Sequence, residues 1–67
     1  MAQKMAKANQ SVEKALQLVE VLAQAREPMR LQDVAEAAGL PPSTALRMLH
    51  TLILCGYANQ DPMTLRY

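Results

Sequence analysis

Apolar residues return every three or four positions along most of the chain, which is the spacing of one face of an α-helix. Three segments carry this pattern, and their apolar positions are Val12, Ala15, Leu16, Val19, Leu22 and Ala23, then Val34, Ala35 and Ala38, then Ala45, Met48, Leu49 and Leu52. The pattern predicts three amphipathic helices, over residues 11–25, 33–38 and 42–55. Residues 1–10 lack any such periodicity, and we expect them to form a disordered amino-terminal arm.

Local signals set the ends of these helices. Ser11 is expected to cap the start of the first helix, and Pro28 prevents that helix from continuing. Gly39 fits the end of the second, because glycine takes the left-handed conformation at little cost. Pro41 and Pro42 mark the start of the third, where a missing N–H costs nothing.

The segments outside the helices predict a small β-wing. Residues 29–31 are too short for an independent strand but could supply a single bridge to a later hairpin, which residues 56–67 would begin. A helix, a glycine turn, a second helix and a short wing describe a winged helix-turn-helix. We therefore expect a mostly α fold with three helices and a short, truncated β-wing.

The third helix is predicted to have two chemically different faces. Counting 100° per residue from Ala45 places Ser43, Arg47, His50 and Leu54 opposite the apolar residues. Residues 37–60 contain no acidic side chain, so this part of the chain presents a weakly positive field.

The amino-acid composition argues against several kinds of protein and site. The 67 residues include no Phe and no Trp and carry a net charge of +1, which allows one small domain with an aliphatic core. A lone Cys55, expected to be a small buried hydrophobe, excludes an internal disulfide, and with the lone His50 it leaves no cluster for a metal site. His50 also has no nucleophile or carboxylate partner at a workable spacing, so we expect neither an enzyme nor a cofactor. No signal peptide or membrane span is apparent, and the expected location is the cytoplasm.

From residue 11 to residue 67 the chain resembles the amino-terminal winged helix-turn-helix of IclR-type transcriptional regulators. The resemblance rests on SVEKALQLVEVL, LQDVAEAAGLPPSTALRMLHTL and GYANQDPMTLRY, and its most specific part is the pattern A-x-x-x-G-L-P-x-S-T-x-x-R-x-L-x-x-L. It implies a DNA-binding domain over residues 11–67 that acts as a homodimer on double-stranded DNA. It also implies a fragment of a longer regulator, whose small-molecule effector would bind a domain absent here.

Four positions depart from the pattern of that family. Arg30 stands where Ser or Thr often caps the second helix, and Pro42 stands where a basic residue would offer a phosphate contact. Leu46 occupies a position that is often His or Tyr, and Leu65 replaces the glycine frequently found in the wing turn. These departures leave the geometry of the wing open.

The candidate DNA-binding residues each have a simpler alternative. The proposed set is Ser43, Thr44, Leu46, Arg47, His50 and Arg66. Arg47 is expected to read a guanine edge or grip a phosphate, although it could be an ordinary solvated charge. Ser43 and Thr44 could contact DNA or simply cap the helix. His50 and Arg66 are expected to contact the DNA backbone, whereas Lys4 and Lys7 are expected to aid solubility.

Two functions from different classes remain open. In the first, the helix over residues 42–55 enters the major groove as one half of a dimer and provides sequence-specific binding. In the second, the domain binds a protein instead of DNA, which would suit its weak net charge and the apolar Leu46 and Leu54.

A second apolar stripe on the first helix offers a surface for dimerisation. Leu18, Val21 and Ala25 lie away from the stripe assigned to the core, and Val21 is expected to face solvent and contact a second copy. The alternative is that the other helices wrap around both stripes, in which case Leu18 belongs to the core.

Overall fold

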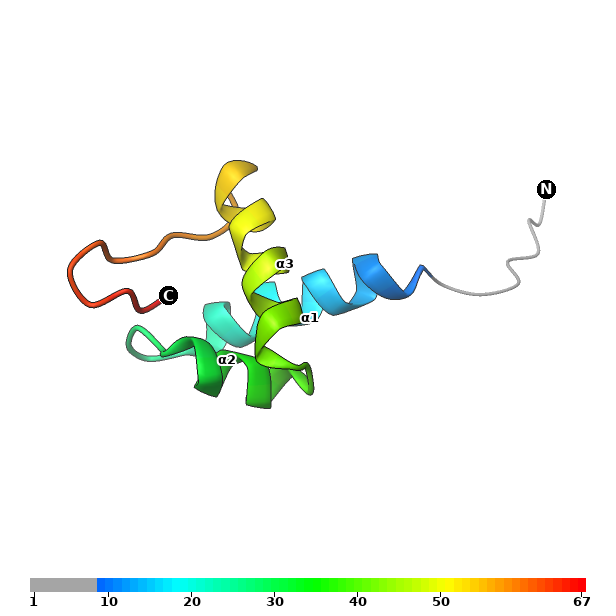
Figure 1. The fold of residues 1–67 in the computed structure, drawn as a ribbon, viewed down its shortest axis with the longest axis horizontal. Coiled ribbons are helices and arrows are strands. Elements are labelled where there is room, and N and C mark those ends of the chain that lie inside the picture. The colour runs from blue at the N-terminus through cyan, green and yellow to red at the C-terminus, as the bar shows by residue number, and fades with distance from the viewer. Residues whose placement is uncertain (1–8) are drawn as a thin grey trace.

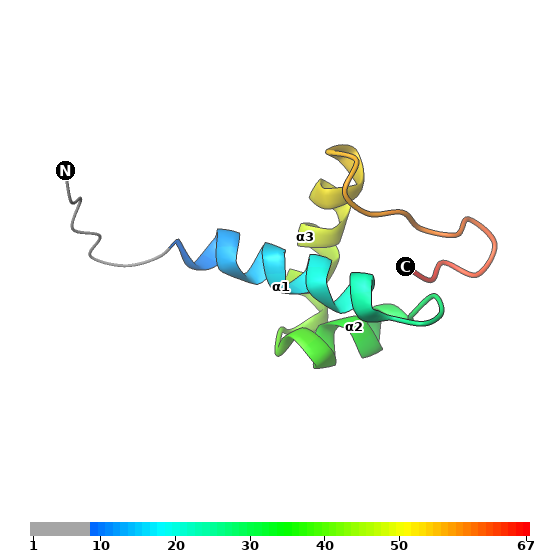
Figure 2. The same ribbon diagram turned by 180° about the vertical axis from the view of Figure 1, so that it is seen from behind.

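The computed structural model describes residues 9–67, which form three helices followed by a returning segment. The helices are α1 (Gln10–Gln24), α2 (Leu31–Ala38) and α3 (Pro42–Leu54). In Figures 1 and 2, α3 crosses α1, α2 lies beside both, and the carboxy-terminal segment turns back toward the connection between α1 and α2. The three predicted helices and the mostly α class are confirmed.

The start of α1 differs from the prediction. Helix α1 begins at Gln10, and its N-cap is Asn9, whose side-chain Oδ1 accepts a hydrogen bond from the Val12 N–H at 3.2 Å. The assignment of Ser11 as the cap is wrong, because Asn is as good a cap as Ser and here lies two residues earlier. The rest of the expected arm, residues 1–8, lies outside the described residues together with Lys4 and Lys7.

The core lies where the three helices meet. Its fully or nearly buried members are Leu18 from α1, Val34, Ala35 and Ala38 from α2, and Ala45 and Leu49 from α3. Small alanines on α2 and α3 allow the helices to approach closely, while three larger side chains, Leu18, Leu49 and Val34, fill the centre. The predicted apolar sides of α2 and α3 are therefore confirmed.

The predicted core face of α1 is wrong in its first turns. Val12 and Leu16 are 54% and 59% exposed, whereas Leu18 is fully buried and Val21 packs against the core. The physical reason is that the amino-terminal part of α1 extends beyond α2 and α3, so its first turns have little to pack against (Figure 1). Val21 is half-buried, so the prediction that it faces solvent is wrong.

The carboxy-terminal segment contains no strand within residues 9–67, but it is tied to the domain. The Met29 and Tyr67 backbones exchange two hydrogen bonds, each of 2.7 Å, and both side chains pack against the core. This pair of hydrogen bonds is the contact expected from residues 29–31, but the expected β-hairpin is absent, because residues 56–67 form no strand and Leu31 already belongs to α2. Cys55, expected to be buried, is exposed, because it follows the last residue of α3 where the chain leaves the core.

The turn at the tip of the returning segment is held by one aspartate. The Asp61 Oδ1 atom accepts hydrogen bonds from the Met63 and Thr64 N–H groups, at 2.8 and 3.4 Å. The Asp61 carbonyl accepts from the Leu65 N–H at 2.7 Å, and Leu65 has a positive φ of 63°. The position where the family often has glycine therefore does adopt the left-handed conformation, here with a leucine.

Candidate nucleic-acid interface

The turn between α2 and α3 fixes the angle at which α3 is presented. Gly39 has φ 70°, and its N–H donates to the Glu36 carbonyl at 3.1 Å while the Leu40 N–H donates to the Ala35 carbonyl at 2.9 Å. This pair of bonds is the Schellman arrangement, which satisfies the last carbonyls of a helix. Leu40 then packs against the core, so the turn is anchored by both hydrogen bonds and apolar contact.

Helix α3 starts without a side-chain cap. Pro41 is the N-cap in extended conformation and Pro42 is the first helical residue, so the pre-set φ of proline does the work of starting the helix. Neither Ser43 nor Thr44 makes a capping hydrogen bond. The Ser43 hydroxyl is exposed and remains available to a ligand, whereas Thr44 is half-buried.

The two faces of α3 agree with the prediction. Ala45 and Leu49 are fully buried against α1 and α2, while Ser43, Arg47 and His50 are exposed on the outer side. Two leucines are exposed as well: Leu46 at 47% and Leu54 at 73%. The outer face therefore combines hydrogen-bond donors with apolar contacts, which suits base edges and thymine methyl groups in a major groove.

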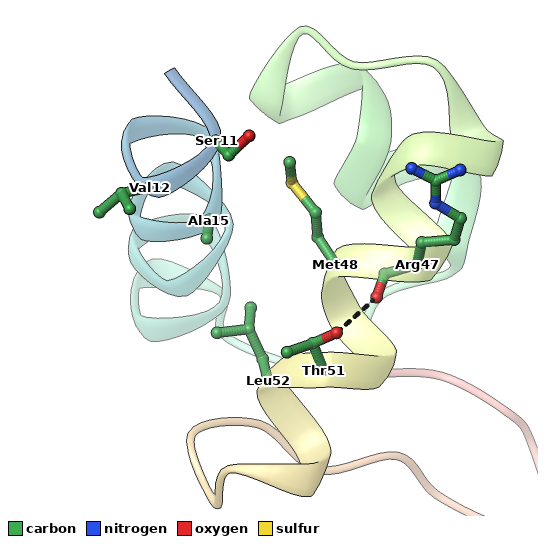
Figure 3. Close-up of a pocket in the computed structure, with 7 residues that line it drawn as sticks. All are labelled: Ser11, Val12, Ala15, Arg47, Met48, Thr51 and Leu52. Atoms are coloured by element: carbon green, nitrogen blue, oxygen red, sulfur yellow. Dashed lines mark hydrogen bonds between the residues drawn. The ribbon is translucent and has the colours of Figure 1, made fainter. Parts of the chain in front are cut away.

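Arg47 is exposed and lies on the side of α3 that faces away from α1 (Figure 3). Its backbone carbonyl accepts a hydrogen bond of 3.2 Å from the Thr51 hydroxyl, one turn further along α3. Met48 and Leu52 point the other way, toward α1, and help to line an apolar groove of about 330 Å³ between α1 and α3 (Figure 3). Arg47 also borders this groove, and its side chain is exposed, outside the core.

Arg66 lies away from α3, on the returning segment. It is half-buried, and together with Pro28 and Arg30 it lines a hollow between that segment and the α1–α2 connection. Arg30 was not among the predicted site residues. The signal that could have found it is the bridge expected from residues 29–31, because a bridge there brings Arg30 beside the returning segment.

The described residues contain no group of three or more His, Cys, Asp or Glu side chains that could hold a metal ion. None of the three helices is long and apolar enough to span a membrane. The first turn of α3 carries no acidic residue, so no carboxylate there opposes an approaching anion.

Comparisons with known proteins identify the family of the chain. The IclR helix-turn-helix domain model matches residues 11–62. The HTH-type transcriptional regulator XynR of Escherichia coli (strain K12) is 36% identical over 58 residues, which cover 87% of this chain and 23% of XynR. The chain thus spans about a quarter of the length of that relative. No solved structure gives a significant match.

Proposed function

The chain belongs to the IclR helix-turn-helix family of DNA-binding transcriptional regulators, and from this premise we propose that α3 enters the major groove of double-stranded DNA and reads its sequence. The observation that carries the proposal is the outer face of α3, where Arg47 is exposed beside Ser43 and His50. The proposed site is completed by Thr44 and Leu46 on the same helix and by Arg66 on the returning segment. The regulator would act in the cytoplasm, where it meets DNA.

Each proposed residue has a role that its chemistry allows. Arg47 can donate two hydrogen bonds to the O6 and N7 atoms of a guanine, the commonest specific contact in major grooves. Ser43 can donate to a base edge or a phosphate, and His50 can reach a backbone phosphate one turn away. Leu46 can pack against a thymine methyl group.

We also propose that the domain acts as a homodimer that places two α3 helices on two half-sites. The exposed Val12 and Leu16, one turn apart on α1, support this, because together they form an unpaired apolar surface. Sedimentation at increasing concentration should show association of the wild type that Leu16→Glu abolishes. The control, Leu54→Glu, makes the same change at an exposed site on α3; equal association of all three proteins would exclude this surface.

A binding experiment tests the DNA-reading role. Duplexes selected from a random pool by the wild type would be titrated with wild type, Arg47→Ala and the control Arg26→Ala, whose side chain is exposed in the α1–α2 connection. Loss of a base contact should cost about 1–3 kcal/mol, roughly a five- to 150-fold loss of affinity, and relax the preference at one base pair. Circular dichroism would confirm that each variant is folded.

The outcomes separate the two functions. Affinity that falls as salt rises supports DNA binding, because salt competes with phosphate contacts. If Arg47→Ala kept the affinity and the sequence preference of the wild type, Arg47 would not belong to the proposed DNA-binding site. No binding of the wild type to any duplex at low salt would refute the proposal and favour a protein-binding role for the outer face of α3.

A further inference from the structure

We infer that Arg30 and Arg66 together form a second anion site, which holds one backbone phosphate of the duplex that α3 enters. The inference rests on the proposed function, since the phosphate is that of the bound DNA. It starts from the returning segment, whose last residue exchanges two backbone hydrogen bonds with Met29.

The backbone pairing places the two arginines opposite each other. Met29 and Tyr67 donate to one another's carbonyls at 2.7 Å, which is the pattern of a hydrogen-bonded pair in an antiparallel ladder. The next pair along such a ladder is Arg30 with Arg66, and directly opposed residues have Cβ atoms roughly 4.5–5.5 Å apart. The extended conformation of Arg30, with φ −73° and ψ 154°, fits this register.

The two arginines share the outer side of the pairing. Side chains alternate between the two sides of an extended segment, and opposed residues share a side. Met29 and Tyr67 pack against the core, so Arg30 and Arg66 face away from it. Both line the same hollow, with Pro28, Asp61 and Thr64 as its other walls.

The charged side chains that line the hollow favour the binding of an anion. Like charges directly opposite each other in a ladder are destabilising. Asp61 is the acidic residue of the hollow, and its Oδ1 atom accepts from the Met63 and Thr64 N–H groups, so one carboxylate faces two guanidinium groups and the hollow keeps a net positive charge. The side-chain hydrogen bonds among residues 9–67 use neither guanidinium, so their donors remain available to a ligand. A phosphate accepts from guanidinium groups in bidentate geometry and relieves the repulsion.

Both backbones are held in place before the ligand arrives. The Arg30 carbonyl accepts from the Val34 N–H at 3.0 Å in the first turn of α2. The Arg66 carbonyl accepts from the Asp61 N–H at 2.9 Å, and its N–H donates to the Thr64 hydroxyl oxygen at 3.3 Å. Fixing the site in advance lowers the entropy lost on binding. Arginines that line a hollow suit phosphates on the outside of a duplex better than base edges within a groove.

The test compares Arg30→Gln/Arg66→Gln with wild type and with Arg26→Gln, which removes a nearby exposed charge outside the hollow. Affinity for a selected duplex and for a scrambled duplex would be measured over a range of salt concentrations. Loss of one phosphate contact should lower both affinities by the same factor, roughly five-fold near 0.15 M salt, and reduce the salt slope by about 1. Arg26→Gln should match the wild type in slope.

The possible results separate this site from the function it rests on. If the double variant bound DNA with the wild-type affinity and the wild-type salt dependence, the Arg30–Arg66 site would be refuted. The proposed reading of DNA by α3 would be unaffected. A loss confined to the selected duplex would mean that the arginines read bases, and it would also overturn the phosphate assignment. If the wild type bound no duplex, both the proposed DNA-binding function and this phosphate site would be refuted.

Thermal melting in low salt gives a readout that does not depend on DNA. Relief of the repulsion should leave the double variant melting at or above the wild-type temperature, and added inorganic phosphate should raise the melting temperature of the wild type more than that of the variant. A double variant that melts well below the wild type would show that the arginines hold the returning segment in place, and would overturn the inference.

Discussion

Replacing Leu65 with glycine should stabilise the domain, because the leucine stands in a conformation that glycine adopts freely. Its φ of 63° lies in the left-handed region, which costs an L-residue about 1–2 kcal/mol. The conformation is held by hydrogen bonds at both ends of the residue: Leu65 N–H donates to the Asp61 carbonyl at 2.7 Å, and the Leu65 carbonyl accepts from Gln60 Nε2 at 3.0 Å.

Two opposing effects reduce the expected gain. Glycine raises the entropy of the unfolded chain, which costs about 0.4–1 kcal/mol. Loss of the leucine side chain costs little, because 62% of its surface is exposed. The net result for Leu65→Gly is a rise of about 0.5–1 kcal/mol in the free energy of unfolding. For a domain of this size the melting temperature should rise by roughly 2–8 °C.

Thermal unfolding followed by circular dichroism measures the effect, with Leu65→Ala as the matched control. Alanine removes the same exposed atoms but keeps the Cβ atom that makes the left-handed conformation costly, so Leu65→Ala should melt no higher than the wild type. The reasoning would be refuted by a Leu65→Gly protein that melts below the wild type. Equal stabilisation by alanine and glycine would refute it too, because the gain would then come from losing the side chain and not from relieving the backbone.

Two further substitutions test the packing. Leu18→Ala should lower the free energy of unfolding, measured in urea, by about 2–5 kcal/mol, because the Leu18 side chain is fully buried. The exposed Leu16 is the control, and Leu16→Ala should stay within about 0.5 kcal/mol of the wild type. Similar losses at both sites would contradict the observed face of α1. Ala45→Asp should unfold the domain, because it places an unpaired charge in the core. The control Leu46→Asp, one residue further on, should leave the domain folded. A wild-type melting temperature for Ala45→Asp would show that the assignment of α3 residues to the buried face is wrong.

The helix-turn-helix itself could be predicted from the sequence because its signals are local. Gly39 marks the end of α2 through its left-handed conformation, and Pro42 stands at the first position of α3, where proline is tolerated. On α3 the apolar positions other than Leu46 and Leu54 form one stripe, so helical counting separates Ala45 from Arg47 without any knowledge of the tertiary structure.

The face of α1 could not be predicted in the same way. This helix has apolar residues on both sides, and helical counting gives no preference between Leu16 and Leu18. The choice depends on where α2 and α3 pack, which is a property of the whole fold. The same limit applies to Cys55, whose exposure follows from the direction in which the chain leaves α3.

The domain holds its two proposed DNA contacts, Arg47 on α3 and the phosphate site on the returning segment, with different rigidity, and this difference suits two different roles. Helix α3 is anchored by the turn at Gly39 and by buried side chains such as Leu49, so Arg47 stands on a rigid element, as a base-reading residue requires. The returning segment is tied to the α1–α2 connection through the Met29–Tyr67 backbone pair and the packing of Tyr67. A phosphate contact tolerates a looser support, because it fixes the orientation of the protein without discriminating between bases.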